Sequence, residues 1–336
     1  MIIKTRNIKI TPLLLVVALL LFGMACDTQE DKEILTEEKV QEDDVQDDNE
    51  EEPIDEEPVE EEESEEEEED SEVISNPDDD FYQGTRANFP RIVEYPTEMP
   101  HKDKLYIFFM AGQSNMAGRG LVEPSDTIPN NRILSIDSTA SWILAKEPLH
   151  WYEPKFTGLD CGMSFASTLL NSLPSDVTVA VIPCAVGGSN IHNWQTNAEH
   201  RGVFLLDNFK SKVAFAKQYG TIKGVIWHQG ESNTSTSAAT YKTKLTDVID
   251  IFRTEIGDNE LPFIMGELGQ YTSPQDKQDK WDTFNDNLHL IANEDPNLSV
   301  VSSDGFTDIG DGTHLDSRSL REMGKRYAEE YLELTQ

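Results

Sequence analysis

The chain has 336 residues and a formal net charge of -37, which is distributed unevenly. Residues 27–80 carry 31 acidic and 2 basic side chains, whereas residues 81–336 carry 33 acidic and 22 basic ones. The C-terminal part is therefore only mildly acidic and shows no basic surface of the kind that binds nucleic acid. Its length suffices for one large domain with a substantial core.

The first 26 residues have the order of a secretory signal. Three basic residues precede an apolar run over 13–22, and small residues then lead to Cys26. This order is typical of an export signal, and a cysteine at this place resembles a bacterial lipoprotein signal. The run is short for a spanning helix. We expect residues 1–26 to be a signal peptide and Cys26 to be lipidated, so that the protein is exported and held to a membrane at the cell surface or the periplasmic face. Plain secretion and an uncleaved anchor are the alternatives.

Residues 27–80 form a separate acidic segment that includes five consecutive glutamates at 65–69. Almost no aromatic residues occur here, so the segment cannot bury enough apolar surface to offset the entropy of ordering. Its like charges repel one another and extend the chain. We expect a disordered tether that spaces the domain 81–336 from the membrane.

Apolar runs of strand length alternate with segments of helical period from residue 105 onward. Such alternation predicts an α/β fold with a doubly wound, mostly parallel sheet. In that fold the carboxyl ends of the strands share one crevice. The preceding segment 81–101 is rich in proline, and 119–154 is a long crossover with short edge strands expected near 133–136. The five main strands are expected at 105–109, 177–183, 224–227, 262–265 and 298–301.

Polar motifs follow three of these strands. The first strand leads into Gly112-Gln113-Ser114-Asn115-Met116, which places Ser114 like a nucleophile at the crevice. A serine needs a histidine to accept its proton and an acid to orient that histidine. The motif Asp311-Gly312-Thr313-His314 offers both. The strand 177–183 ends in a tight exit with the paired glycines 187 and 188, and the strand 224–227 leads into His228-Gln229-Gly230-Glu231.

The motifs at 112–116, 228–231 and 311–314, together with the helix-opening Gly162, resemble in order and spacing the blocks of the SGNH hydrolase superfamily. Within it they resemble the branch of sialate O-acetylesterases and carbohydrate esterase family six, which includes acetylxylan esterases. The resemblance covers about residues 104–333. It implies a three-layer, flavodoxin-like α/β fold around a mostly parallel five-stranded sheet.

The resemblance also implies roles for individual residues. Ser114 is the expected nucleophile, His314 the base and Asp311 the acid that orients it. The N–H groups of Ser114 and Gly162 and the side chain of Gln229 are the expected oxyanion donors. Ester cleavage builds negative charge on the carbonyl oxygen, and preorganised donors of this kind stabilise it.

Three assignments stay open. Asn233 is an alternative to Gln229 as the side-chain donor. Glu231 competes with Asp311 for His314 or assists it, and it could equally cap the following segment. His228 has either a binding or a structural role. The side chains expected to bind substrate are those of Gln113, Asn115 and His228.

The sequence thus predicts an exported carbohydrate O-acetylesterase that acts on xylan-like or sialate saccharides through a serine acetyl-enzyme. The alternatives are a lipase or thioesterase of the same superfamily and a non-catalytic glycan-binding surface lipoprotein. We expect a monomer that needs no cofactor. We also expect no metal, because the remaining histidines show no metal-ligand spacing. Three aromatic residues are candidates for stacking on sugar rings, namely Trp151, Trp194 and Tyr271. Cys161 and Cys184 could pair or stay free.

Overall fold

The computed structural model describes residues 93–336. The expected signal peptide, its Cys26 and the acidic tether lie outside the described residues, as does the start of the proline-rich segment. Across the described part, no helix is both long and apolar enough to cross a membrane.

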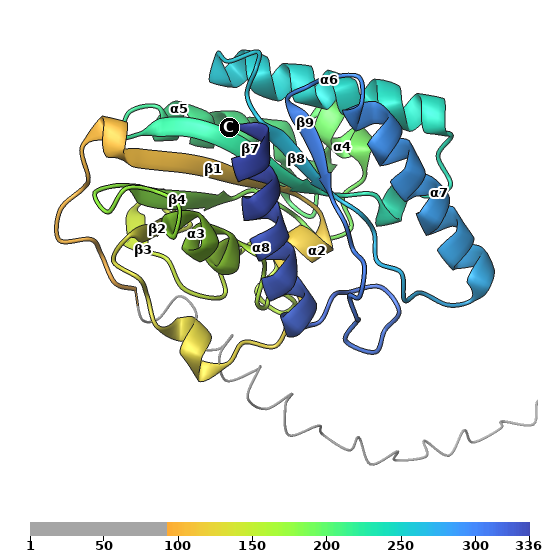
Figure 1. Cartoon of the computed structure of the whole chain (residues 1–336), viewed down its shortest axis with the longest axis horizontal. Coiled ribbons are helices and arrows are strands. Elements are labelled where there is room, and N and C mark those ends of the chain that lie inside the picture. The colour runs from red at the N-terminus through yellow and green to blue at the C-terminus, as the bar shows by residue number, and fades with distance from the viewer. Residues whose placement is uncertain (1–92) are drawn as a thin grey trace, which may run out of the picture. The chain divides into compact units, whose positions relative to one another are not determined.

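A seven-stranded sheet forms the centre of the domain (Figure 1), in the order β3-β2-β4-β1-β7-β8-β9. All neighbouring strands run parallel except β2 and β3. The strands are β1 (Leu105–Gly112), β2 (Ile133–Ile136), β3 (Trp142–Leu144), β4 (Thr178–Pro183), β7 (Thr221–His228), β8 (Phe263–Gly266) and β9 (Leu298–Val301).

The five main strands are confirmed in place, whereas the strand count of five was wrong. The difference lies at one edge, where β2 pairs with β4 and β3 pairs antiparallel with β2. A strand of three residues such as β3 carries no readable period of its own, because its pairing partner determines its conformation. A further pair of short strands, β5 (Glu199–His200) and β6 (Val203–Phe204), forms a separate hairpin.

Helices cover both faces of the sheet and make three layers. One face packs against α3 (Gly162–Leu170) and α8 (Ser317–Leu334), the latter crossing in front of the sheet in Figure 1. The other face packs against α4 (Ile191–Thr196), α5 (Leu205–Ala216), α6 (Ala238–Ile256) and α7 (Gln275–Ala292). The short elements are α2 (Ser114–Ala117), η1 (Lys102–Lys104), η2 (Pro124–Thr127) and η3 (Glu231–Asn233).

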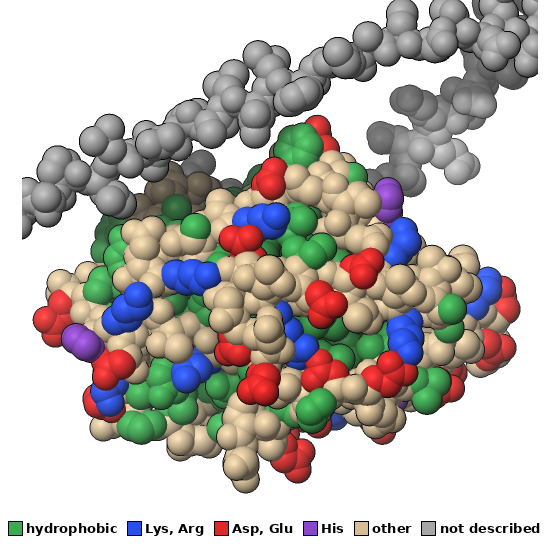
Figure 2. All heavy atoms as spheres, turned by 90° about the horizontal axis from the view of Figure 1, so that it is seen from above, with side chains coloured by type: hydrophobic (Ala, Val, Ile, Leu, Met, Phe, Trp, Pro, Cys, Tyr) green, Lys and Arg blue, Asp and Glu red, His purple; other side chains and the backbone are tan. Residues whose placement is uncertain are grey.

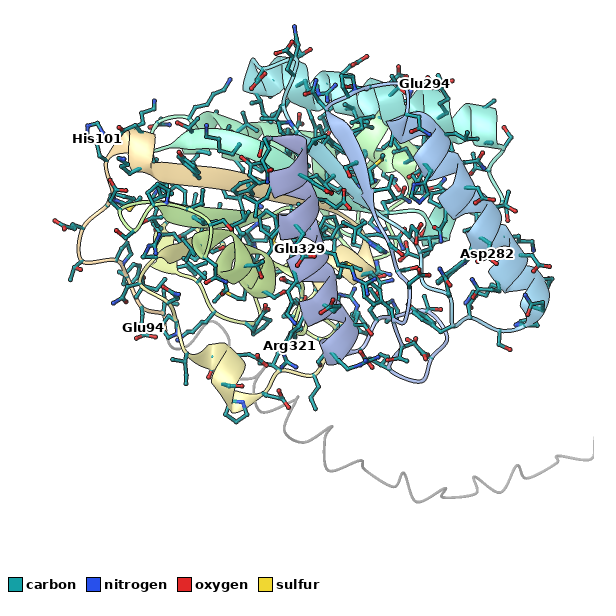
Figure 3. The ribbon with its side chains drawn as sticks, in the orientation of Figure 1. Glu94, His101, Asp282, Glu294, Arg321 and Glu329 are labelled. Atoms are coloured by element: carbon teal, nitrogen blue, oxygen red, sulfur yellow. The ribbon has the colours of Figure 1, made fainter. Side chains whose placement is uncertain are left out.

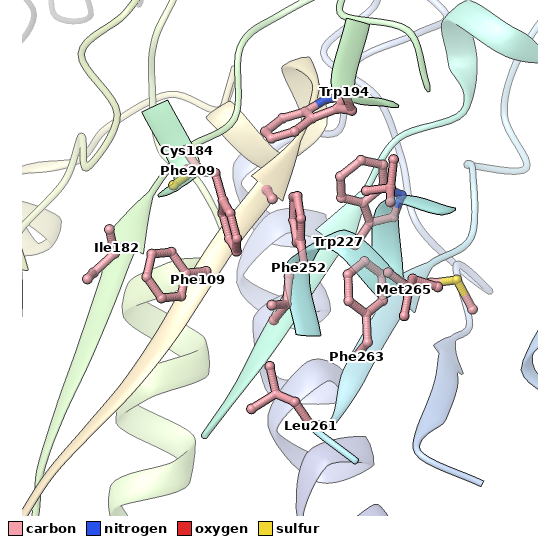
Figure 4. Packing of buried hydrophobic residues seen from close by; sticks show 14 of the residues in the cluster. Phe109, Ile182, Cys184, Trp194, Phe209, Trp227, Phe252, Leu261, Phe263 and Met265 are labelled. Carbon is pink, nitrogen blue, oxygen red and sulfur yellow. The ribbon is translucent and has the colours of Figure 1, made fainter. Parts of the chain in front are cut away.

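Aromatic side chains fill the core between the sheet and the α4–α6 layer (Figure 4). The rings of Phe209 and Phe252 stack with centroids 3.6 Å apart, and Trp194 meets Trp227 edge to face at 5.3 Å. All four are buried, and each such side chain contributes about 1.5–3 kcal/mol on burial. Trp194 therefore belongs to the core and cannot stack on a sugar, contrary to the expectation from sequence.

Charged residues mix in sign over the surface. On the face shown in Figure 2, acidic and basic side chains are interspersed among polar and apolar ones. Arg321 on α8, labelled in Figure 3, lies 2.7 Å from both Glu123 and Asp126 and so ties this helix to η2. Because Asp126 is largely buried and Arg321 only one-third exposed, this network fixes the start of α8 better than an isolated surface pair would.

Candidate active site

A sharp turn places Ser114 at the end of β1. Gly112 has a φ of 135°, and a Cβ at this position would lie 2.0 Å from the carbonyl oxygen of His228. The N–H of Gln113 donates to that carbonyl at 2.9 Å, so the chain leaves β1 pinned against β7. Ser114 then opens the four-residue helix α2. No described residue accepts a hydrogen bond from its N–H, as expected for a first helical residue.

The structure brings Ser114, His314 and Asp311 together. The Nε2 atom of His314 lies 3.0 Å from Ser114 Oγ, and its Nδ1 lies 2.6 Å from Asp311 Oδ2. The other Asp311 oxygen accepts the N–H groups of Thr313 at 2.9 Å and His314 at 2.8 Å. The three side chains thus have the spacing of a nucleophile, its base and the base's orienting acid.

The protonation of Asp311 follows from these contacts. Partial burial raises the pKa of its carboxyl, but the hydrogen bonds from His314 and Thr313 outweigh burial and hold the pKa below its ordinary value. Asp311 is therefore ionised at neutral pH and accepts the proton on Nδ1 of His314. This leaves Nε2 free to accept the proton of Ser114.

Glu231 contacts other partners than His314. Its Oε1 atom lies 3.5 Å from His228 Nε2 and accepts a hydrogen bond of 2.5 Å from the side-chain amide of Asn115. Burial raises the pKa of Glu231, yet the neighbouring His228 imidazole and the hydrogen bond from Asn115 contribute to a larger opposite effect, so the pKa lies below its ordinary value. The structure thus places Asp311, rather than Glu231, against His314.

Asn115 and His228 are buried and face the protein. The Asn115 amide also donates to the carbonyl of Thr313 at 3.1 Å, and its oxygen accepts the N–H of Leu315 at 2.9 Å, so it holds the chain on both sides of His314. His228 is 0% exposed and Asn115 1%. Neither side chain can reach a substrate in this structure, which corrects the expectation from sequence and favours the structural reading of His228.

Three of the expected oxyanion donors are already engaged. The N–H of Gly162 donates to Asp160 Oδ1 at 2.7 Å. The amide nitrogen of Gln229 lies 2.7 Å from Asn233 Oδ1 and 3.2 Å from Gln113 Oε1. The Asn233 amide itself donates to Thr236 Oγ1 at 3.2 Å. In this conformation neither Gly162 nor Gln229 offers a free donor, whereas the second N–H of the Asn233 amide has no acceptor among the described residues. Gln229 instead joins the loops after β1 and β7.

The loop after β4 presents a free backbone N–H that the sequence analysis did not single out as a candidate donor. This strand neighbours β1, and Ser189 Oγ donates to the carbonyl of Gly112 at 3.1 Å while Gln229 reaches the carbonyl of Ser189 at 3.3 Å. The loop therefore lies beside the Ser114 turn. No described residue accepts a hydrogen bond from the N–H of Gly188, whose φ is 74°. The paired glycines were the sequence signal, but strand order was needed to place them.

The remaining candidates take separate places. Trp151 stacks on Tyr152 with centroids 5.3 Å apart. Tyr271 is half-buried, and its hydroxyl donates to the carbonyl of Thr313 at 3.0 Å, so it lies beside the loop that carries His314. Cys161 and Cys184 are buried free thiols. Among residues 93–336, no group of three or more His, Cys, Asp or Glu side chains is arranged to hold a metal ion.

Comparison with known proteins assigns the family. A family model described as "Carbohydrate esterase, sialic acid-specific acetylesterase" matches residues 104–333. The "Probable carbohydrate esterase At4g34215" of Arabidopsis thaliana is 29% identical over 246 residues, which are 67% of this chain and 90% of that protein. Its crystal structure superposes with a TM-score of 0.59 at 27% identity, covering 68% of this chain and 98% of that one.

The crystal structure of NanS shares the fold, with a TM-score of 0.54 at 17% identity over 70% of this chain and 99% of the other. Both structures share the fold of this domain, whose mostly parallel sheet is flanked by helices. The family match spans more than half of the chain. The chain is therefore a serine ester hydrolase that belongs to the carbohydrate esterase family of sialic acid-specific acetylesterases.

Proposed function

We propose that the protein removes acetyl groups from xylan-like or sialate saccharides through an acetyl-enzyme on Ser114. The observation that supports this most is the pair of contacts that joins Ser114 Oγ to His314 Nε2 and His314 Nδ1 to Asp311. Ser114 Oγ attacks the acetyl carbonyl as its proton passes to Nε2. The sugar oxygen leaves with that proton, and a water activated by His314 then attacks the acetyl-enzyme and releases acetate.

The oxyanion of each tetrahedral intermediate needs donors near Ser114. We assign this role to the N–H groups of Ser114 and Gly188, which have no acceptor among the described residues. The loop of Gly188 is held against the Ser114 turn by Ser189 and Gln229. Loss of one such donor costs about 3–4 kcal/mol of transition-state stabilisation in serine hydrolases.

The primary test is turnover of an aryl acetate by the purified chain. Ser114→Ala should lose nearly all activity, because it removes the attacking oxygen. Ser211→Ala, an exposed serine on α5 whose hydroxyl donates to Asn208 O, is the matched control and should be unchanged. Full turnover by Ser114→Ala would remove this residue from the mechanism.

The substrate is tested by acetate release from a panel of acetylated xylan oligosaccharides and O-acetylated sialic acids. Esters of longer acyl chains complete the panel. Activity that rises with acyl length would contradict an acetylesterase and indicate a lipase or thioesterase. Binding of the saccharides without turnover would indicate a glycan-binding protein.

The N-terminal 80 residues carry a separate proposal, supported by sequence alone. We infer that the chain is exported, that Cys26 is lipidated, and that the acidic segment 27–80 spaces the monomeric domain from the membrane. Fractionation of cells that express the wild type and Cys26→Ala tests this. The wild type should partition with membranes and the variant should not be lipidated. Equal lipid labelling of both would refute the assignment.

A further inference from the structure

The residue before the Gly188 donor is held at both of its backbone polar groups. On one side, the N–H of Gly187 donates to Glu153 Oε2 at 2.5 Å. Glu153 is buried in the crossover between β3 and α3, and its carboxylate also accepts hydrogen bonds from Arg119 at 2.9 Å and from Arg201. This carboxylate is therefore fixed from three directions.

On the other side, the carbonyl of Gly187 lies 2.8 Å from Nε2 of His200. A carbonyl only accepts, so this nitrogen must carry a proton for the hydrogen bond to exist. His200 lies on β5, at the turn of the β5–β6 hairpin, where Arg201 and Gly202 both have positive φ. The hairpin thus presents His200 to Gly187 and Arg201 to Glu153 together.

Holding Gly187 fixes the direction of the next N–H. The peptide between Gly187 and Gly188 is planar and trans, so its N–H points opposite to its carbonyl. Since His200 holds the carbonyl, the N–H of Gly188 must point away from the hairpin. There is no room for a side chain in this arrangement, because a Cβ on Gly187 would lie 2.2 Å from the guanidinium of Arg119.

We propose that Glu153 and His200, here called the Gly187 clamp, are positioning residues that aim the N–H of Gly188 at the oxyanion. The proposal rests on the function proposed above and adds two residues that touch neither Ser114 nor His314. An oxyanion donor acts only when its position matches the developing charge, and its loss typically costs about 100-fold to 1,000-fold in kcat. A loosened clamp should misdirect the donor and lower kcat by a smaller factor.

A purely structural role makes a different prediction. Burial lowers the pKa of Arg119 to about 10, and Glu153 is the carboxylate beside it, so loss of Glu153 would leave Arg119 unpaired and lower the Tm. Loss of the His200 side chain should leave no buried charge without its ion-pair partner, because His200 is half-buried and contacts a backbone carbonyl. Variants of His200 therefore separate an effect on the orientation of the Gly188 N–H from an effect on the Tm.

The deciding experiment measures kcat, KM and boronic acid inhibition for His200→Ala. Phenylboronic acid adds to a catalytic serine and mimics the tetrahedral intermediate, so it needs the same donors. We expect kcat to fall about 10-fold to 100-fold, KM to change less than about threefold, and affinity for the boronic acid to fall in parallel with kcat. His200→Gln, whose amide can donate to the same carbonyl, should recover part of kcat.

His192→Ala is the matched control, an exposed histidine on α4 whose ring has no contact with Gly187, and it should behave as the wild type. Glu153→Gln should lower both the Tm and kcat. A His200→Ala enzyme with unchanged kcat, or with only KM raised, would overturn the clamp. The proposed function fails separately, since its failure requires turnover by Ser114→Ala.

Discussion

The side-chain amide of Asn115 joins the Glu231 carboxylate, at 2.5 Å, to the backbone on either side of His314. This contact connects the turn after β1 with the loop before α8. Asn115→Ala should therefore loosen His314 without touching its ring, and we expect kcat to fall about 10-fold to 100-fold. Steady-state kinetics on an aryl acetate measure this. Asn287→Ala, which removes an amide on α7 that donates to Thr283, is the control. Equal kcat in both variants would refute the role.

Asp311 and Glu231 differ in what they do for the imidazole, and paired variants distinguish them. Asp311→Asn keeps the size but places an amide against Nδ1 of His314, which favours the wrong tautomer. We expect kcat to drop about 1,000-fold or more. Glu231→Gln leaves Asp311 in place, so its kcat should exceed that of Asp311→Asn at least about 10-fold. The reverse order of kcat values would make Glu231 the partner of His314.

Gly112 has a positive φ and also lies against the His228 backbone, and the cost of the close approach can be separated from the cost of the positive φ. Gly112→Ala would press a Cβ into the His228 backbone, so we expect a loss of about 3 kcal/mol or more in unfolding free energy. Gly305→Ala also has positive φ, at 76°, but meets no atom within 4 Å, and should cost only about 1 kcal/mol. Urea unfolding measures both. Equal losses would show that the close approach to His228 is unimportant.

Lys212 should make the free energy of unfolding vary with pH in the alkaline range. Its ammonium is buried against Pro183 O and lies 4.7 Å from the Trp151 ring centre, and burial lowers the pKa of Lys212 from 10.5 to about 8. Between these values the unfolded chain binds more protons than the folded one, so this residue makes the unfolding free energy rise with pH. The rise amounts to at most about 3 kcal/mol.

Lys212→Met should lack the rise of the unfolding free energy with pH that Lys212 contributes. Urea unfolding across the window from about pH 8 to pH 10.5 compares it with the wild type. Lys210→Met, on the same helix, controls for the loss of one positive charge. A wild-type stability that falls relative to Lys212→Met as the pH rises would contradict the assignment.

Much of the site could be predicted because its parts lie at strand ends. The apolar run that forms β1 and the polar motif after it were visible in sequence. The rule that parallel strands end at one crevice then brought Ser114 and His314 together across 200 residues. The choice between Asp311 and Glu231 as the partner of His314 was harder to predict. The backbone hydrogen bonds from Thr313 and His314 that hold Asp311 depend on a loop conformation that composition does not encode.

The oxyanion donors could not be placed for a related reason. Gly162 begins α3 and Gly188 lies in the loop after β4, and nothing in their local sequence says which N–H is free. The N–H of Gly162 donates a hydrogen bond to the side chain of Asp160, only two residues earlier in the sequence. Gly188 becomes a candidate because β4 neighbours β1, and that adjacency is a property of the assembled sheet. Trp194 was misread similarly, because a six-residue helix shows too little period to reveal its buried face.

His314 lies three residues ahead of α8, whose first turn is capped by Asp316 and whose apolar side packs on α3. During synthesis Ser114 emerges 200 residues before His314. A chain in which α8 has not docked would hold the Ser114 turn without His314 beside it, and under the proposed mechanism it should hydrolyse nothing. Under that mechanism, hydrolysis reports whether α8 has docked on α3.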